Sequence, residues 1–389
     1  MARKTEPFLL ARGGPFFDLQ KEAGLVQAER LNSFRRAVFF VAVAWLVPLM
    51  ICVMAGTAFG PLTARPYLLD PGVWARSFLA IGLFVLAEAQ IEKGLHDGVV
   101  HFFESGLLPP SSLSRAKSAV ARALRRRDNA LAEAVFALLA IGASVFLLWN
   151  MRDQTVASWA VKPGPNGVSY TAAAWWSIVV SNTLFWFLFM RAVWRHVIWS
   201  MLLKTFSRLE TRLVATHPDG HAGLAFVGRY PNVYVLFTVA VGCVVSAAVT
   251  HQVLHGTLTA STFGSVAGLW LVVIAAYFSL PLLGFIGPLL DLRRKTLQIA
   301  SERATDYQRQ VEHNTLGGNI AAPSDKTEST DLPDPGKLYD SAKKLSPVLI
   351  TKSAMIPVFI SALLPFIAVG LTQLPVKELL PVLKRLLLL

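Results

Sequence analysis

A long uncharged stretch constrains the fold of this chain more than any other feature. Residues 230–290 contain no Lys, Arg, Asp or Glu. A helix needs about 20 apolar residues to cross the roughly 30 Å hydrocarbon core of a bilayer. The stretch therefore has room for two spans, at 231–250 and near 263–290, with His251 and His255 at the turn between them. These residues predict an integral membrane protein.

The composition of the whole chain agrees with this prediction. Hydrophobic residues make up 54% of the sequence, charged residues make up 16%, and the mean hydropathy is +0.50. A water-soluble fold of this length needs more polar surface. The net charge of +13 comes from basic residues that flank apolar runs, so we expect contact with anionic lipids and no nucleic-acid partner. Cys52 and Cys243 both lie inside predicted spans and indicate no disulfide or metal framework.

Five further runs complete the predicted bundle. Four of them are apolar over spanning length, at 37–57, 130–150, 170–190 and 353–376, with Glu133 as their one acid. We expect the run at 37–57 to be retained as a helix, because residues 1–36 are far longer than the charged region of a signal peptide. The fifth run, 77–96, contains Glu88, Glu92 and Lys93.

The positive-inside rule supports counting that charged run as a span. Seven spans with a cytosolic N-terminus place 30 Lys and Arg residues on the cytosolic side and 7 on the other side. Six spans give at best 25 and 12. We therefore predict an all-α bundle of seven spans with the N-terminus inside and the C-terminus outside.

The segments outside the spans complete the predicted organisation. The proposed division is a cytosolic arm at 1–36, a six-span bundle at 37–290 with cytosolic loops at 92–129 and 191–230, a cytosolic helix and linker at 291–349, and a seventh span with an interfacial tail at 350–389. The linker is the Gly- and Pro-rich stretch 317–336. In the first loop, Leu113, Val120 and Leu124 share one face of a basic helix. That helix either lies on the anionic leaflet or is a solvated loop helix that fixes topology.

Four ionisable residues are predicted to lie within the inner half of the membrane or at its inner edge. They are Glu88, Glu133, Arg191 and Arg195, and ionisable groups at such depth are functional hypotheses. One interpretation is a carboxylate–arginine network that supports a proton or ion path. The other, which we favour, is a structural salt bridge or the snorkelling of the arginines to headgroups.

The most distinctive polar motif outside the spans surrounds His217, Asp219 and His221. Pro218-Asp219-Gly220 is favourable turn chemistry, so we favour a structural turn. Two histidines and a carboxylate could also hold a divalent metal or a phosphate, or take part in catalysis. We predict no cofactor and leave a divalent metal at this turn as the alternative.

Glycine and proline predict an irregular sixth span. Pro281, Gly284, Gly287 and Pro288 fall in its inner half, where they should kink or break the helix.

Several segments together resemble a family of bacterial multi-pass inner-membrane proteins that has an HPD segment and no assigned activity. The similarity covers most of the chain. It rests on Leu86-Ala87-Glu88, Phe102-Phe103, Ala132-Glu133, Ala174-Trp175-Trp176, Phe189-Met190-Arg191, Trp194-Arg195, Ser207-Arg208-Leu209, His217-Pro218-Asp219 and 332–357. Ala222 and Ala225 stand where the family has glycines, which puts a close backbone approach to a ligand in doubt. The resemblance implies a bacterial inner-membrane location and seven spans.

No nucleotide-binding loop, metal-spaced Cys/His cluster or nucleophile elbow is present in the sequence. The leading expectation is a non-enzymatic bundle that is an oligomeric channel or transporter, or a membrane scaffold, with the lipid bilayer and further copies of the chain as its partners. One alternative is a membrane-embedded enzyme that acts on lipid or headgroup substrates at the cytosolic interface. The other is a sensor or assembly factor that signals through 291–349.

Overall fold

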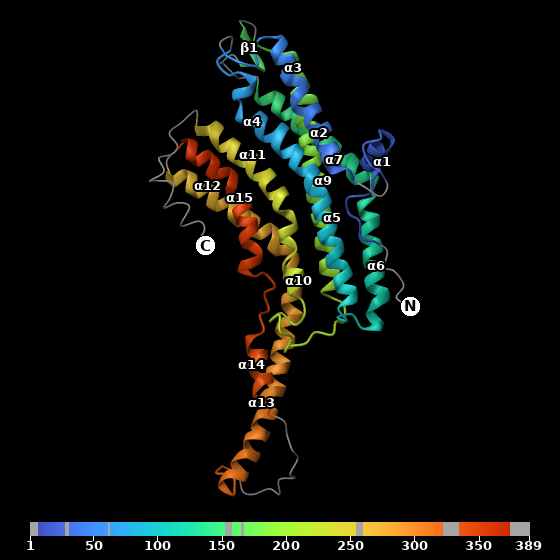
Figure 1. Ribbon diagram of the computed structural model, residues 1–389, viewed down its shortest axis with the longest axis vertical. Helices are drawn as coiled ribbons and strands as arrows, with labels where there is room; N and C mark the ends of the chain where they lie inside the picture. The colour runs from blue at the N-terminus through green and yellow to red at the C-terminus, as the bar shows by residue number, and fades with distance from the viewer. Residues whose placement is uncertain are drawn as a thin grey trace.

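The computed structural model describes residues 7–27, 31–60, 63–151, 158–164, 167–253, 260–321 and 334–373, and these are mostly helical. Within these ranges, seven helices are long and apolar enough to cross a membrane, which confirms the predicted all-α bundle (Figure 1). The second, charge-bearing span is among them. The spans are Ser33–Met54, Pro71–Glu104, Ala130–Asn150, Ala172–Phe206, Ala225–Val249, Thr262–Leu316 and Lys352–Thr372. The predicted tail at 374–389 and His255 lie outside the described residues.

Three spans combine α-helix with a π-helical segment. Span 1 comprises α2 (Ser33–Val41), η1 (Ala42–Leu46) and α3 (Val47–Met54); span 2 comprises α4 (Pro71–Val73), η3 (Trp74–Ala80) and α5 (Ile81–Glu104); span 4 comprises α8 (Ala172–Trp176), η4 (Ser177–Asn182) and α9 (Thr183–Phe206). The three π-helical segments contact one another.

Proline explains the irregular stretch of span 1. Pro48 has no N–H to donate to the carbonyl of Ala44, and a freed carbonyl inside a membrane needs another donor. The Ser181 hydroxyl of span 4 donates to that oxygen at 2.6 Å. The Trp176 indole donates to the neighbouring Val43 carbonyl at 2.9 Å. Spans 1 and 4 are therefore joined by polar contacts that the proline makes available.

The other spans and the short elements follow in order. Span 3 is α7 (Ala130–Asn150); span 5 is α10 (Ala225–Gly228), η5 (Tyr230–Tyr234) and α11 (Val235–Val253); span 6 is α12 (Ala260–Ser279), η6 (Leu280–Phe285) and α13 (Ile286–Leu316); span 7 is α15 (Lys352–Gln373). Outside them lie α1 (Pro15–Glu22), η2 (Tyr67–Leu69), α6 (Pro110–Arg127) and α14 (Gly336–Lys344). The strands β1 (Val161–Gly164) and β2 (Gly167–Tyr170) form an antiparallel hairpin that pairs Val161 with Tyr170.

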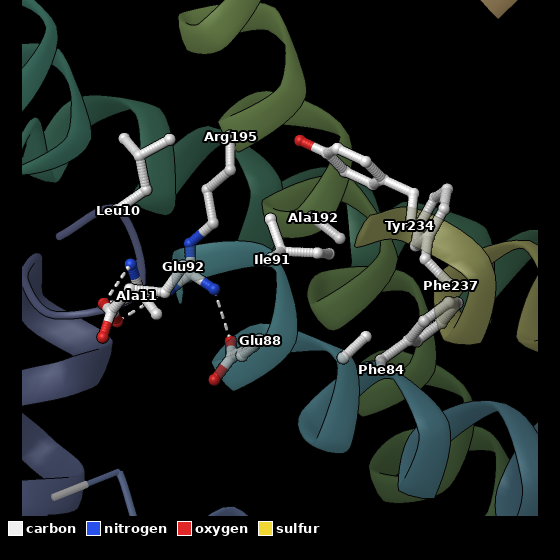
Figure 2. Close-up of a pocket in the computed structure, with 11 residues that line it drawn as sticks. Leu10, Ala11, Phe84, Glu88, Ile91, Glu92, Ala192, Arg195, Tyr234 and Phe237 are labelled. Atoms are coloured by element: carbon white, nitrogen blue, oxygen red, sulfur yellow. Dashed lines mark hydrogen bonds and ion pairs between the residues drawn. The ribbon is translucent and has the colours of Figure 1, made fainter. Parts of the chain in front are cut away.

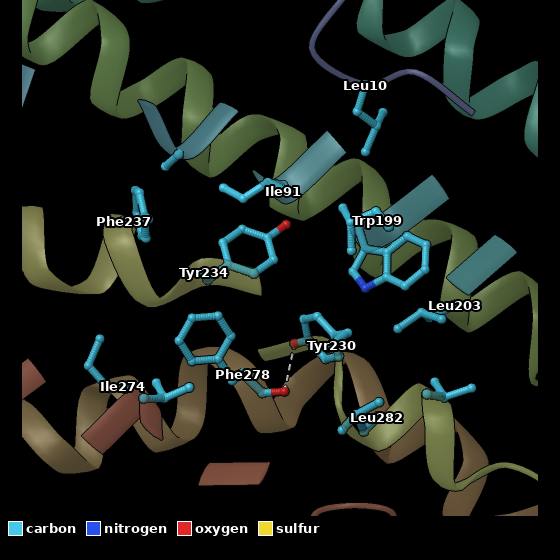
Figure 3. Packing of buried hydrophobic residues seen from close by; sticks show 14 of the residues in the cluster. Leu10, Ile91, Trp199, Leu203, Tyr230, Tyr234, Phe237, Ile274, Phe278 and Leu282 are labelled. Atoms are coloured by element: carbon cyan, nitrogen blue, oxygen red, sulfur yellow. Dashed lines mark hydrogen bonds between the residues drawn. The ribbon is translucent and has the colours of Figure 1, made fainter. Parts of the chain in front are cut away.

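The spans form two groups that meet along span 2 and α9. Spans 1 to 4 lie together below the hairpin, while α11, α12 and α15 lie beside them (Figure 1). Figure 3 shows the seam, where Ile91 and Trp199 face Tyr234 and Phe278 across the core. Within the second group, the Tyr230 hydroxyl donates to the Phe278 carbonyl at 2.7 Å. We call the end of the bundle that carries β1 and β2 the hairpin end, and the opposite end, where α6 lies, the basic end.

The helix predicted in the first loop is present, but the proposed position on the leaflet is wrong. α6 packs along α9, roughly parallel to the bundle axis (Figure 1). Its buried face consists mainly of small residues, Ser112, Ala116, Ala119, Val120 and Ala123. Leu113 and Leu124 also pack against the main core. Small side chains allow close packing of two helices, so this apolar face is covered by protein and not by lipid.

The proline- and glycine-rich stretch of span 6 interrupts the α-helix, as the sequence predicts. η6 is a 3₁₀ segment that begins one residue before Pro281 and contains Gly284. After it, α13 runs for 31 residues, about 46 Å at 1.5 Å per residue. Its far portion extends beyond the rest of the bundle, with α14 beside it (Figure 1). We call α13 and α14 the stalk.

Candidate functional site

The four predicted intramembrane residues come together beside the start of α7. Glu88 lies on α5, Glu133 on α7, and Arg191 and Arg195 lie one turn apart on α9. Arg36 of α2 joins them and is 1% exposed. Arg36 and Glu133 each lie in the first turn of their span, whereas Glu88 lies near the middle of span 2.

Glu88 is the centre of the cluster. Its Oε1 atom lies 2.5 Å from Arg195 Nη1 and 3.2 Å from Arg191 Nη1. Its Oε2 atom lies 2.7 Å from Arg36 Nη1. The four-residue spacing of Arg191 and Arg195 places both guanidinium groups on one face of α9. One carboxylate therefore binds three arginines from two spans.

Glu133 caps a helix that belongs to the N-terminal arm. Its Oε2 atom accepts the Phe16 backbone N–H at 2.7 Å, in the first turn of α1. The first N–H groups of a helix lack internal partners, and the residue before α1 is Gly14, which has no side chain to cap them. The other oxygen of Glu133 accepts Arg191 Nε at 2.9 Å. This carboxylate thus links α7, α9 and α1.

The extended residues before α1 are bound by the same groups. We call residues 8–16 the N-terminal segment. Glu92 accepts the Ala11 backbone N–H at 3.0 Å and Arg12 Nε at 2.9 Å. In the opposite direction, Arg195 donates to the Ala11 carbonyl at 3.0 Å, and Arg191 donates to the Gly13 carbonyl at 3.1 Å. The segment therefore supplies both donors and acceptors to the buried charges.

Backbone conformation explains the two glycines of this segment. Gly13 and Gly14 have φ values of 146° and 86°, which disfavour any residue with a side chain. A Cβ atom at Gly14 would lie 2.7 Å from Glu133 Oε1. The glycines let the chain turn into α1 directly against the carboxylate.

The charges of the cluster nearly balance. Three arginines face Glu88 and Glu133, and the surplus positive charge is stabilised by the carbonyls of Ala11 and Gly13 and by Gln20, which accepts Arg36 Nε at 2.7 Å. Such pairing is what buried charges require. The cavity beside Glu88, shown in Figure 2, has a volume of about 20 Å³, enough for a single water molecule.

The predicted HPD turn is a separate site with a structural role. Asp219 Oδ1 accepts the backbone N–H groups of His221 and Gly223, at 2.8 and 3.1 Å, and Oδ2 accepts that of Ala225 at 3.0 Å. Ala225 is the first residue of α10, so Asp219 caps that helix. Burial raises the pKa of Asp219, but these hydrogen bonds and His217 outweigh it and the pKa is lowered.

The two histidines do not complete a metal site with the described part of the chain. No group of three or more His, Cys, Asp or Glu side chains is placed to hold a metal ion among the described residues. His217 Nδ1 lies 2.8 Å from Asp219 Oδ1, and His221 Nδ1 lies 2.8 Å from the Asp219 carbonyl. Both rings therefore contribute to the turn itself.

Sequence reasoning placed Glu88, Glu133, Arg191 and Arg195 in one region but missed three participants. Arg36 was assigned to the arm, Glu92 was noted only as a charge within a span, and the N-terminal segment had no role. The matching four-residue spacing of Glu88–Glu92 and Arg191–Arg195 is a sequence signal that indicates Glu92 as a further member of the cluster. A second signal is the Gly13-Gly14-Pro15 run. Comparison with family models, curated proteins and solved structures gives no match.

Proposed function

We propose that this protein is a membrane scaffold, a rigid seven-span bundle that holds the stalk on the cytosolic side for a protein partner. The observation that carries this proposal is the state of the buried carboxylates. Both oxygens of Glu88, Glu92 and Glu133 are bound by arginines or by backbone N–H groups of the N-terminal segment.

Such pairing argues against an ion path through Glu88. A transported cation or proton needs an oxygen that can exchange partners, and here each exchange would break a buried ion pair. The cavity beside Glu88 holds about one water molecule. The same contacts fasten the arm, α2, α5, α7 and α9 together, which is what a scaffold requires.

The stalk supplies the presenting surface. Of the residues of α13, only Leu289 and Ala300 are buried, and Ile299 is 56% exposed. α14 packs against α13, and Arg293 Nη2 donates to the Lys343 carbonyl at 2.9 Å. α13 begins directly after η6 and continues outward as one 31-residue helix, so a partner bound there is held at a fixed distance from η6.

Two measurements test the proposal. The first compares proton and potassium flux in proteoliposomes with flux in empty liposomes. We expect equal rates, and a flux that Glu88→Gln abolishes while the surface variant Asp128→Asn preserves it would refute the scaffold. The side chain of Asp128 is 44% exposed, so this carboxylate is a suitable control for a buried one.

The second measurement is photo-crosslinking in native membranes. A benzophenone amino acid at Ile299 should give discrete protein adducts, because this side chain lies on the stalk. The matched control is Leu138 of α7, which is 69% exposed on a membrane-spanning helix and should give lipid adducts. Absence of protein adducts at Ile299 in intact cells contradicts a scaffold that acts through the stalk.

A further inference from the structure

A second cavity lies between α5, α9 and the start of span 5, apart from the Glu88 cluster. Its volume is about 290 Å³. Buried aromatic side chains form much of its wall, namely Phe102, Trp199, Phe206 and Tyr230. Three polar residues, Asp97, His101 and Arg229, line it from exposed positions and form its rim.

The wall contains a buried donor without an acceptor. The indole N–H of Trp199 has no hydrogen-bond partner among the described residues, although the side chain is only 3% exposed. Figure 3 shows this nitrogen directed toward Tyr230, which lines the same cavity. The nitrogen atom itself has almost no accessible surface, so it is closed off from the cavity and Trp199 contributes apolar surface to the wall.

The rim carries charges of both signs. Asp97 and Arg229 form no ion pair with the described part of the chain. Two opposite charges on one opening complement a ligand that itself carries an anion and a cation. A ligand with an anion alone would place that anion beside the Asp97 carboxylate.

The position of the rim defines where such a ligand would come from. Arg229 is the last charged residue before the uncharged stretch 230–290, and Tyr230 begins η5. The rim therefore lies at the boundary between polar and apolar residues, where phospholipid headgroups are found. A volume near 300 Å³ accommodates a headgroup with its glycerol, while two acyl chains would remain in the bilayer.

We propose that this cavity binds a phospholipid headgroup that contains both a phosphodiester and a primary ammonium. Arg229 binds the phosphate, and Asp97 accepts hydrogen bonds from the ammonium. The aromatic wall contacts the glycerol and the first methylene groups. This site is independent of the stalk and of the scaffold role.

The test is native mass spectrometry of the full chain with an equimolar mixture of phosphatidylethanolamine, phosphatidylcholine and phosphatidylglycerol. The wild-type protein should retain phosphatidylethanolamine about tenfold better than phosphatidylcholine, because a trimethylated ammonium cannot donate hydrogen bonds. Asp97→Asn should remove this preference. Arg229→Gln should weaken retention of every phospholipid by about tenfold.

Two further variants keep the result interpretable. Gly98→Leu adds a side chain inside the cavity, where a Cβ atom would lie 3.7 Å from Trp199 Cη2, and it should abolish retention. Arg122→Gln removes an exposed charge from α6 and should behave as the wild type. Equal retention of all three lipids by the wild type overturns the proposal. So does a preference for phosphatidylglycerol that Asp97→Asn leaves unchanged, and so does lipid retention unaffected by Gly98→Leu.

Discussion

Replacement of Glu88 by Gln tests the central structural argument most directly. Gln has nearly the same volume as Glu, so the substitution removes one negative charge without creating a cavity. Arg36, Arg191 and Arg195 would then face one another across a neutral amide, and of the three only Arg191 would keep an ion pair, with Glu133. Removal of one partner from a buried ion pair costs about 3–5 kcal/mol, because the opposite charge remains buried.

The loss of unfolding free energy caused by Glu88→Gln can be compared with the loss at an exposed ion pair. Asp128 lies 2.6 Å from Arg127, and its side chain is 44% exposed. Asp128→Asn should therefore lower the free energy of unfolding by about 0–1 kcal/mol. Both variants would be unfolded by a denaturing detergent in mixed micelles, with tryptophan fluorescence as the probe. Each free energy is then compared with that of the wild type.

A second substitution distinguishes surplus charge from lost packing. Arg36→Met in the Glu88→Gln background removes one of the cations that lost its partner, while the apolar part of the side chain remains. The double variant should recover about 1–3 kcal/mol relative to additive behaviour. Equal destabilisation by Glu88→Gln and Asp128→Asn would refute the reasoning, and so would strict additivity of the two changes.

Three other outcomes are expected in the same assay. Gly14→Ala should destabilise the protein by about 1–3 kcal/mol, because φ is 86° and a Cβ atom would lie 2.7 Å from Glu133 Oε1. Gly24 has a φ of 69° and open space around it, so Gly24→Ala measures the cost of the backbone conformation without a steric clash. Asp219→Ala should cost about 1–2 kcal/mol through the lost cap of α10. The pKa of Asp219 is lowered in the folded protein, so the carboxylate stabilises the fold above the unfolded pKa of about 4, and this stabilisation is lost as the pH falls through the folded pKa. Asp219→Asn should therefore flatten this part of the dependence of stability on pH. Gly228→Ala should prevent stable packing, because a Cβ atom there would lie 2.0 Å from the Leu349 carbonyl oxygen, and unchanged expression and melting would contradict this.

The spans could be predicted because their determinants are local. A run such as 130–150 is apolar over the length that a bilayer requires, and this property needs no knowledge of neighbouring helices. The second span was less evident, since Glu88, Glu92 and Lys93 lower its hydropathy. It could still be predicted because topology couples every span to the distribution of Lys and Arg. The break near Pro281 is local as well, since proline removes a backbone donor wherever it occurs.

The face of α6 shows where local reasoning fails. An amphipathic, basic helix has the same sequence pattern whether its apolar side meets lipid or protein. Leu113 and Val120 pack into the main core because span 4 runs for 35 residues, longer than a bilayer requires, and α6 packs along α9. The length of α9 and the placement of its neighbours decide this contact.

The uncharged stretch and the apolar runs thus determined a membrane bundle with six spans, because hydrophobic length is a property of consecutive residues, and the distribution of Lys and Arg added the second, charged span. The partners of the buried charges were decided by tertiary structure alone. Glu88 and Arg36 are far apart in the sequence, and the Ala11 and Gly13 carbonyls have no side-chain signature that could reveal them as ligands of Arg195 and Arg191. A buried charge needs partners from whatever segments surround it, and only the folded chain brings those segments together.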